Sequence, residues 1–361
     1  MTNNTDLSNN PLEPWIHPWP EYGLEAVTRC PICGGSKRCL LHPDLVDDVF
    51  RTAPGKWNLW KCVDCKSAYL DPRPSADTIY LAYENYYTHT QAREKVSYES
   101  LSRFRKLRQS LINGYTNWRY ATRATPFSWW GVVIVMLLPN LRAPLDRKFR
   151  HLPRFPPNGG RLLDVGCGNG AFLDLAKSCG WEVAGLDPDP VAVEYCKKRQ
   201  LSVETGGFEV FSAQSEIFDV ITLSHVIEHT PNPVQVLCAC HALLKPGGQL
   251  WLETPNIESI GHSRFQRHWR GLEIPRHLVL LSRGALRQAM IEAGFQPPHD
   301  LACPNAPLGM FLSSHAIARA QTAPNRPHIP GRIRLEAIFA SIFGKFLPSR
   351  REFLTIITRR P

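Results

Sequence analysis

Residues 162–170 combine a short apolar run, an acid and three alternating glycines, and this pattern constrains the fold of the chain most strongly. Asp164 lies near the end of the run, which opens into Gly166, Gly168 and Gly170 before a further apolar stretch. This order is typical of a buried parallel strand, a tight turn and a helix. Glycine lets the backbone turn sharply and lets a ligand approach the main chain. The carboxyl edge of such a strand is where open α/β sheets bind ligands.

A second acid follows at the spacing that nucleotide-binding βαβ units use. Asp187 lies 23 residues after Asp164 and ends another strand-like run, residues 182–186. An acid at that place accepts hydrogen bonds from ribose hydroxyls in NAD, FAD and S-adenosylmethionine sites alike. A pyrophosphate binder usually shows G-x-G-x-x-G, and a carboxylate just before the loop opposes a pyrophosphate but suits a cationic amino acid group. The alternative interpretation is a loop whose glycines serve packing only.

With its downstream segments, the chain resembles a class I S-adenosylmethionine-dependent methyltransferase of the type 11 and type 23 group. The resemblance rests on residues 163–170, 185–187, 218–221 and 244–248, and it covers roughly residues 156–300. It implies an α/β, Rossmann-like, seven-stranded class I methyltransferase fold with S-adenosyl-L-methionine as its cofactor. These motifs are specific for the class and say little about the acceptor.

The same resemblance assigns the cofactor contacts. It implies that Asp164 and the glycine loop hold the methionine part and that Asp187 holds the ribose. The third strand is usually followed by an acid near the adenine, whereas this chain has residues 205–208 there, so the adenine contacts fall to the backbone and Phe208. The expected cofactor-binding residues are Asp164, Gly166, Cys167, Gly168, Gly170, Asp187, Phe208 and Ser224.

Two histidines after the fourth expected strand are candidates for the chemistry. His225 and His229 are four residues apart, so on a helix they would share a face with Glu228 beside them. One interpretation makes either histidine the general base on an acceptor hydroxyl. A second is a divalent metal site, because quinone-pathway O-methyltransferases carry a similar Glu-x-x-Glu-His segment; here His225 replaces the first Glu. A third is a structural role at the strand end.

A long loop after the fifth expected strand is rich in His, Arg and Trp. Loops of this kind at sheet edges tend to carry function. A similar Trp…Pro-Arg-His segment occurs in type 23 methyltransferases near the acceptor pocket, so Arg276 and His277 are candidates for orienting an acceptor or receiving its proton. The alternative is a solvated basic loop that packs under Trp269. The expected catalytic residues are thus His225, His229 and His277.

Two C-x-x-C pairs precede the nucleotide-binding motif. Cys30 with Cys33, and Cys62 with Cys65, each place two thiolates on a tight turn, and two such turns complete a tetrahedral Zn²⁺ site. Cys39 is then a spare cysteine. A disulfide pairing would need an oxidising compartment, yet no apolar signal segment starts the sequence, so a structural zinc ion is preferred over disulfides or free thiols.

This cysteine arrangement resembles the N-terminal module of many type 23 methyltransferases, some of which lie in sugar and polysaccharide pathways. The expected organisation is a flexible tail over residues 1–28, a zinc-ribbon module over 29–74 and a helical connector with an apolar segment over 75–155. The methyltransferase domain then covers 156–361, with a helical insertion near 306–348.

Two apolar segments of unassigned role, residues 126–139 and 333–347, are flanked by arginine and lysine. The first is too short to span a bilayer. A basic-flanked apolar helix can lie on an anionic membrane, and it can equally be core or a lid over a substrate. The formal charge of +10 also raises nucleic acid as a partner, but no RNA-binding signature is present, so nucleic acid is not the expected partner.

The sequence therefore predicts a cytoplasmic S-adenosylmethionine-dependent methyltransferase, with peripheral membrane contact as an open alternative. The expected acceptor is a small molecule, a glycan or a lipid-linked intermediate, methylated on oxygen. The competing hypotheses are an RNA (rRNA) methyltransferase and a non-catalytic binding protein built on a methyltransferase fold.

Overall fold

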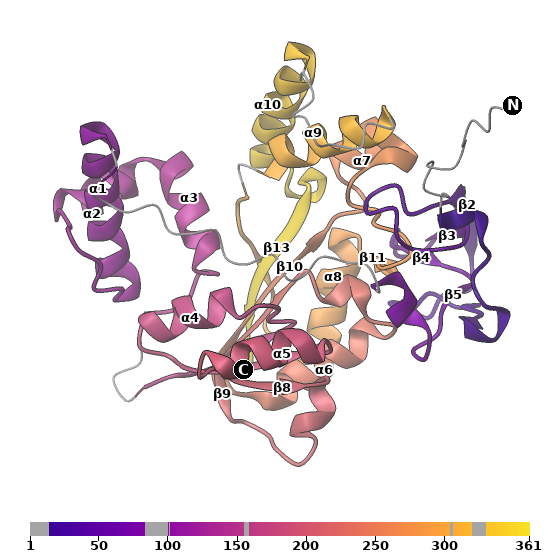
Figure 1. Cartoon of the computed structure of the whole chain (residues 1–361), viewed down its shortest axis with the longest axis horizontal. Helices are drawn as coiled ribbons and strands as arrows, with labels where there is room; N and C mark the ends of the chain where they lie inside the picture. The colour runs from indigo at the N-terminus through magenta and orange to yellow at the C-terminus, as the bar shows by residue number, and fades with distance from the viewer. Residues whose placement is uncertain (1–13, 84–99, 101, 155–158, 304–305, 320–329) are drawn as a thin grey trace, which may run out of the picture.

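A seven-stranded sheet forms the centre of the computed structural model, which describes residues 14–83, 100, 102–154, 159–303, 306–319 and 330–361 (Figure 1). The strand order is β12-β13-β10-β9-β6-β7-β8. The five strands β6 to β10 are parallel to one another, and β13 is antiparallel to β10 and β12. This sheet confirms the predicted seven-stranded class I methyltransferase fold. The strands are β6 (Arg161–Val165), β7 (Glu182–Asp187), β8 (Ser202–Thr205), β9 (Phe218–Ser224), β10 (Leu244–Pro255), β12 (His299–Asp300) and β13 (Phe353–Arg359).

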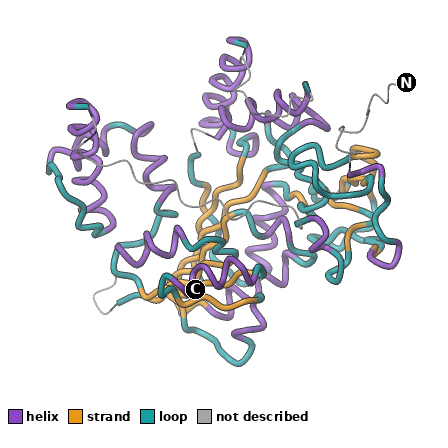
Figure 2. The backbone as a smooth tube through the Cα atoms, in the orientation of Figure 1, coloured by secondary structure: helices purple, strands orange, loops and turns teal. Residues whose placement is uncertain are grey.

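Helices cover both faces of the sheet (Figure 2). Successive strand residues point to opposite faces, so Leu162 of β6 packs with the side chains of α4 and α5, whereas Leu163 packs with those of α6 and α8. Both faces are buried, which is why the parallel strands read as continuous apolar runs. The helices are α4 (Ala171–Ser178), α5 (Pro190–Lys198), α6 (Pro233–Leu243) and α8 (Arg283–Glu292). Single-turn 3-10 helices are η1 (Pro14–Ile16), η2 (Glu21–Gly23), η3 (Ile79–Ala82), η5 (Phe208–Phe211), η6 (Ile227–His229), η7 (Gln266–His268) and η8 (Pro348–Arg350).

The cysteine-rich module forms a second sheet that shares a strand with the methyltransferase part. Its order is β11-β4-β3-β2, and β11 comes from the segment directly after His277. Leu59 and Leu70 of the module lie in one core cluster with Leu280 and Ile257. The two parts are therefore one packed unit. The strands are β2 (Arg38–Leu45), β3 (Trp57–Cys62), β4 (Ala68–Leu70) and β11 (Val279–Leu280), and a separate pair joins β1 (Leu24–Glu25) to β5 (Arg73–Pro74).

The structure differs from the expected tail over residues 1–28. Residues 1–13 lie outside the described part, but 14–28 belong to the folded module. Trp19 is buried, packs edge-on against Trp57 with ring centroids 5.1 Å apart, and donates its indole N–H to Gly23 O and Thr78 Oγ1. Burial of this large ring and the β1–β5 pairing order the segment, despite its polar, proline-rich composition.

Two helical additions border the upper end of β10 and β13 in Figure 1. One comprises α1 (Arg103–Tyr120), α2 (Trp130–Leu137) and α3 (Pro139–Lys148), and its core residues Tyr115 and Phe149 cluster with Leu162 and Phe172. The other comprises α9 (Ala306–Ala318) and α10 (Gly331–Phe346), which lie near the short helix α7 (Ile260–Phe265). Among the described residues, no helix is both long and apolar enough to cross a membrane.

Candidate active site

The glycine loop follows β6 and is held by the acid at the end of β7. Gly168 donates its backbone N–H to the Asp187 carboxylate over 2.7 Å. Gly166, Gly168 and Gly170 all have positive φ, from +51° to +72°, a backbone conformation that glycine adopts readily. A Cβ at Gly166 would collide with Val226, and one at Gly170 with Leu201 and Cys196, whereas a Cβ at Gly168 would meet nothing within 4 Å. Packing explains the outer two glycines, and Gly168 borders open space.

Asp164 lies fully buried at the carboxyl end of β6. Its Oδ1 accepts a 2.8 Å hydrogen bond from Thr222 Oγ1 and pairs with the Arg150 guanidinium, while its Oδ2 has no hydrogen-bond partner among the described residues. Burial raises the pKa of Asp164, and the Arg150 charge and the Thr222 hydrogen bond oppose that rise. A buried carboxylate oxygen without a donor is costly. The ammonium group of the methionine part of S-adenosylmethionine would supply that donor, so the residues present fit this cofactor.

The other expected cofactor residues lie along the same sheet edge. Asp187 pairs with Thr205 of β8, and Phe208, half-buried, begins η5 three residues later. Cys167 is buried within the loop, and burial raises the pKa of its thiol, so the thiol stays protonated. Ser224 ends β9 and lines a cavity of about 270 Å³. Its lining residues are Pro144, Arg147, Lys148, Arg150, Ser224, His225, Trp251, Glu253 and Cys303.

The order of strands arranges these groups in space. From β7 through β6 and β9 to β10, the carboxyl ends carry Asp187, the glycine loop, His225 and Glu253 in turn. A nucleoside at Asp187 would therefore extend over the glycine loop and direct its other end toward the cavity at β9 and β10. This places the acceptor side of the site between His225 and Glu253.

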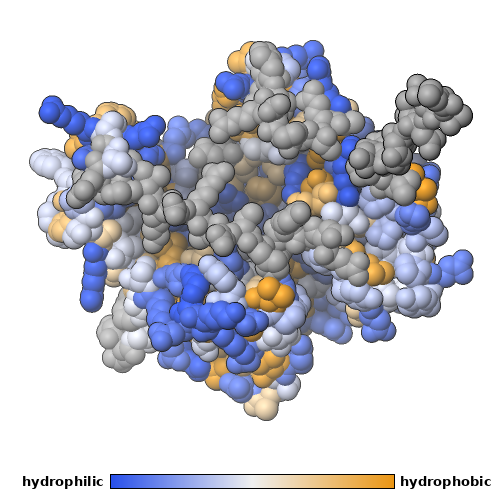
Figure 3. Space-filling view, viewed as in Figure 1, coloured by the Kyte–Doolittle hydropathy of each residue, from blue (hydrophilic) through white to orange (hydrophobic). Residues whose placement is uncertain are grey.

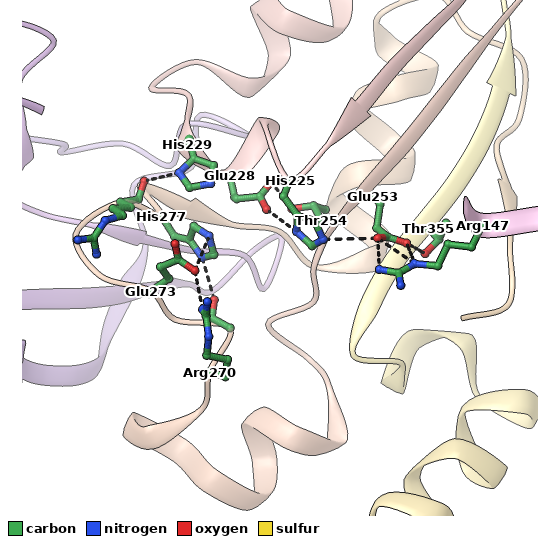
Figure 4. Close-up of polar contacts among 12 residues, drawn as sticks. Arg147, His225, Glu228, His229, Glu253, Thr254, Arg270, Glu273, His277 and Thr355 are labelled. Atoms are coloured by element: carbon green, nitrogen blue, oxygen red, sulfur yellow. Dashed lines mark hydrogen bonds and ion pairs between the residues drawn. The ribbon is translucent and has the colours of Figure 1, made fainter. Parts of the chain in front are cut away.

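His225 lies between two buried carboxylates (Figure 4). Its Nδ1 is 3.1 Å from Glu228 Oε1, and its Nε2 is 3.4 Å from Glu253 Oε1. Burial lowers the pKa of His225, but hydrogen bonds and charges from Glu228 and Glu253 outweigh burial and raise the pKa to about 10. A histidine with that pKa is protonated at neutral pH, so it can donate a hydrogen bond but cannot accept a proton as a general base.

Glu253 is the acid that sequence reasoning missed. It lies in β10, where Arg147 of α3 pairs with both of its carboxylate oxygens and Thr355 Oγ1 donates to Oε2 over 2.8 Å. Burial raises the pKa of Glu253, but the hydrogen bonds from His225 and Arg147 prevail and lower it to about 2. Glu253 lies near the end of an apolar strand, as Asp164 does, and this position could have identified it as a site residue from the sequence. No sequence pattern identified Arg147 and Arg150, because they reach the site from the helical connector before the sheet.

His229 turns away from His225. His225 has a positive φ and donates its backbone N–H to Glu253 O. The residues after it form the single 3-10 turn η6 and not an α-helix. The expected shared helical face is therefore wrong. His229 instead lies against His277, with ring centroids 4.7 Å apart, and its Nδ1 contacts Arg276 O at 3.1 Å. One ligand atom each of Glu228, His229 and His277 lie within 4.8 Å of one another, so this trio could hold a metal ion.

His277 and Arg276 are both buried. His277 Nδ1 donates to Gly271 O over 2.9 Å, and burial, followed by the nearby His229, lowers its pKa to about 3. Arg276 pairs with the buried Asp47 over 3.0 Å and donates to Thr52 Oγ1 over 2.6 Å, so it joins the cysteine-rich module to the methyltransferase part. Arg276, expected to orient an acceptor, thus has its charge engaged at this internal contact and does not line the cavity beside His225.

The four paired cysteines converge on one point. Cys30 Sγ lies 3.6 Å from Cys65 Sγ, Cys33 Sγ lies 3.6 Å from Cys62 Sγ, and all four sulfurs lie within 4.8 Å of one another. Zn–S bonds of about 2.3 Å in a tetrahedron place the sulfurs about 3.8 Å apart, so the spacing fits Zn²⁺ and is too long for a disulfide. Cys39 is exposed and lies outside the cluster.

Comparison with known proteins agrees with this geometry. Residues 140–299 match the family described as a methyltransferase domain. The chain is 35% identical over 114 residues to a ubiquinone biosynthesis O-methyltransferase of Xanthomonas axonopodis pv. citri, covering 28% of this chain and 46% of that protein. It is 29% identical over 164 residues to the mitochondrial ubiquinone biosynthesis O-methyltransferase of Rattus norvegicus, covering 39% and 46%.

The chain thus spans about half the length of the curated relatives that it matches. A solved structure of a SAM dependent methyltransferase from Archaeoglobus fulgidus is 21% identical and covers 61% of this chain and 94% of its own, with a TM-score of 0.42. The family match begins at residue 140, so it includes most of α3 with Arg147, and also Arg150, which follows the helix. The chain therefore contains a methyltransferase domain, matched over residues 140–299.

Proposed function

We propose that this protein is an S-adenosylmethionine-dependent O-methyltransferase that acts on a small-molecule or lipid-linked acceptor. The observation that carries the proposal is the buried Asp164 carboxylate, whose Oδ2 has no hydrogen-bond partner within the described part of the chain. It lies beside the open backbone of Gly168 and one strand away from Asp187. A cationic amino acid group joined to a nucleoside matches these three features together. The names of the curated relatives favour oxygen as the methylated atom.

The cofactor, when bound, supplies a methyl group on a positively charged sulfonium. In this proposal Asp164 Oδ2 accepts from the cofactor ammonium, Asp187 accepts from the ribose hydroxyls, and Arg150 turns from Asp164 toward the cofactor carboxylate. Arg150 is well placed for this, because its guanidinium already stacks on Phe172 at 3.8 Å from the ring centroid and lines the cavity. Methyl transfer then depends mainly on alignment of the acceptor oxygen.

On the acceptor side, protonated His225 takes a different role from the one expected of it. Arg147, Lys148 and Arg150 around the same cavity provide positive potential that favours an ionised acceptor hydroxyl. The two N–H groups of His225 face Glu228 and Glu253, so the imidazolium offsets the negative charge of these carboxylates beside the acceptor. Lowering the pKa of the acceptor in this way removes the need for a strong base beside it. His229 and His277 lie near Glu228 and outside the lining of the cavity. We place the enzyme in the cytoplasm, where four thiolates remain available for zinc.

Asp164→Asn tests the cofactor assignment. The amide keeps the side-chain shape and the Thr222 hydrogen bond but loses the charge that attracts an ammonium, so the Kd for S-adenosylmethionine should rise at least about tenfold. Isothermal calorimetry measures the Kd, and Asp77→Asn, at an exposed position, is the matched control. An unchanged Kd in Asp164→Asn, with the wild-type melting curve preserved, would refute the assignment.

Transfer of a labelled methyl group tests the acceptor class. We expect label from the cofactor to enter an organic extract of cells rather than total RNA. Label in RNA would instead support the RNA methyltransferase hypothesis. Cofactor binding without transfer to either fraction would support a non-catalytic binding protein.

A further inference from the structure

The helix α10 directs most of its large apolar side chains to solvent. Its buried residues are Ile333, Ala337, Ala340 and Gly344, and the helix packs on α9. The opposite face carries exposed apolar residues, of which Phe346 is 78% and Phe339 60% exposed. A surface helix normally directs its large apolar residues inward, so this outward face indicates a contact outside the described chain. The exposed apolar residues of the α10 face are Leu335, Ile338, Phe339, Ile342, Phe343 and Phe346.

The helix α2 has a second face of this kind. It packs so closely on α1 that a Cβ at Gly131 would lie 1.9 Å from Leu111 O, and Val135 is fully buried. Its other side is exposed, with Trp130 71% and Leu137 74% accessible. Contiguous exposed apolar residues on two separate helices exceed what scattered surface residues produce. The exposed apolar residues of the α2 face are Trp129, Trp130, Val133, Met136, Leu137 and Leu138.

Positive charge is concentrated in the segments that carry these faces. Residues 102–154 hold eleven Lys and Arg against Asp146 alone, and residues 330–351 hold five against Glu336 alone. The rest of the chain has more acidic than basic residues, although the whole chain carries +10. Figure 3 shows strongly hydrophilic side chains beside hydrophobic surface over both helical additions. Apolar faces bordered by cations complement a surface that is apolar inside and negatively charged outside.

Both faces belong to elements that border the cavity. α2 leads directly into α3, whose Pro144, Arg147 and Lys148 line the cavity. Cys303, which also lines the cavity, precedes α9, on which α10 packs. In Figure 1, α1–α3 lie beside the upper end of β13 and α9–α10 lie above it. Both faces thus belong to segments that continue into the lining of the cavity.

We propose that the α2 and α10 faces dock this protein on an anionic lipid bilayer, so that the acceptor enters the cavity from the membrane. The exposed apolar faces and the neighbouring positive charges support the docking by themselves. The entry of the acceptor from the membrane rests in addition on the proposed function. Nucleic acid would explain the cations but leave twelve exposed apolar residues without a role. A bilayer accounts for both, because tryptophan, phenylalanine and leucine enter the interface while arginine contacts the headgroups.

Vesicle co-sedimentation of the full chain tests the docking. Phosphatidylglycerol vesicles should bind the wild type at least about tenfold more tightly than phosphatidylcholine vesicles, and about 0.5 M NaCl should weaken that binding strongly. The double variants Trp130→Ser/Leu137→Ser and Phe339→Ser/Phe346→Ser should each bind at least about tenfold more weakly. The control Tyr22→Ser/Val191→Ser removes exposed apolar residues outside the two faces and should bind as the wild type does.

The outcomes separate this proposal from the others. Failure of the wild type to bind phosphatidylglycerol vesicles, or equal binding by the double variants and the control, would overturn it. A wild-type dimer that both double variants convert to a monomer would show that a second copy covers the faces instead. Calorimetry with S-adenosylmethionine on the same variants should give the wild-type Kd, so a failed cofactor assignment remains distinguishable from failed docking.

Discussion

Neighbouring charges and burial set the protonation states of the ionisable side chains in and near the cavity. Glu253 keeps its charge because Arg147 and His225 contact it, and His225 keeps its proton because two carboxylates face it. His277, buried against His229, stays neutral. The charged pair of His225 and Glu253 thus lies at the cavity, and the neutral His277 lies in the loop before β11. Neighbouring charges outweigh burial where an oppositely charged partner is in close contact.

We predict that the His225 imidazole remains protonated from pH 6 to pH 9. Nitrogen-detected NMR of the His225 side chain would follow its titration. Glu253→Gln removes one of the two carboxylates and should lower the pKa of His225 by at least about one unit. Titration of wild-type His225 near pH 6.5 would contradict the electrostatic role assigned to it.

At the scale of elements, β2 and α7 meet through two histidines. His42 and His262 are both buried, and their Nε2 atoms lie 3.0 Å apart, so one ring donates and the other accepts. Burial, followed by the nearness of His42, lowers the pKa of His262 to about 4. If the accepting imidazole gained a proton, both Nε2 atoms would carry hydrogen and the hydrogen bond between them would be lost. This contact between the cysteine-rich module and the methyltransferase part therefore requires both histidines to be neutral.

The His42–His262 contact predicts a loss of stability at acid pH. Above pH 6.5 both the folded and the unfolded states hold His262 neutral, and the pair is intact. As the pH falls from 6.5 to about 4, the unfolded state gains a proton that the folded state refuses, so the free energy of unfolding decreases by about 3 kcal/mol. Urea unfolding at pH 7 and pH 4 measures this decrease.

The variant His262→Gln should show about 3 kcal/mol less decrease over that interval than the wild type, because glutamine does not titrate. His299→Gln, at an exposed position, should behave as the wild type does. If the wild type and His262→Gln lose the same stability between pH 7 and pH 4, the pair does not titrate as described.

At the scale of the whole molecule, the cysteine cluster and the sheet of seven strands stabilise one common core. β11 completes the sheet of the cysteine-rich module, and the buried pair of Arg276 with Asp47 crosses the same contact. Breaking one partner of a buried ion pair costs about 3–5 kcal/mol. Because the two parts share strands, core and charge pairs, they should unfold in a single transition.

We therefore predict that the purified protein contains about one zinc per chain and that removing it destabilises the methyltransferase part as well. Cys62→Ser/Cys65→Ser should lose the metal and lower the Tm of one cooperative transition, as scanning calorimetry would show. Cys39→Ser, which changes an exposed cysteine outside the cluster, should retain both metal and Tm. Two transitions, with the upper one unaffected by metal loss, would disprove the coupling.

The sequence by itself determined the features that depend on short-range spacing. The strand, glycine loop and acid around Gly168, the second acid Asp187 and the cysteine pairs follow from backbone rules within a few tens of residues. The type of fold followed from the same motifs. These features could be predicted from the sequence because each depends on a local residue pattern that few other structures share.

Only the tertiary structure decided how distant segments share the site. His225 and His229 diverge because β10 and the loop before β11 hold them apart, and Arg150 meets Asp164 only because the connector folds over the sheet edge. Arg276 became an internal partner through Asp47, 229 residues away in sequence. The apolar faces of α2 and α10 became exposed because α1 and α9 cover their other sides. Periodicity shows which residues share a face, but burial depends on what packs against it.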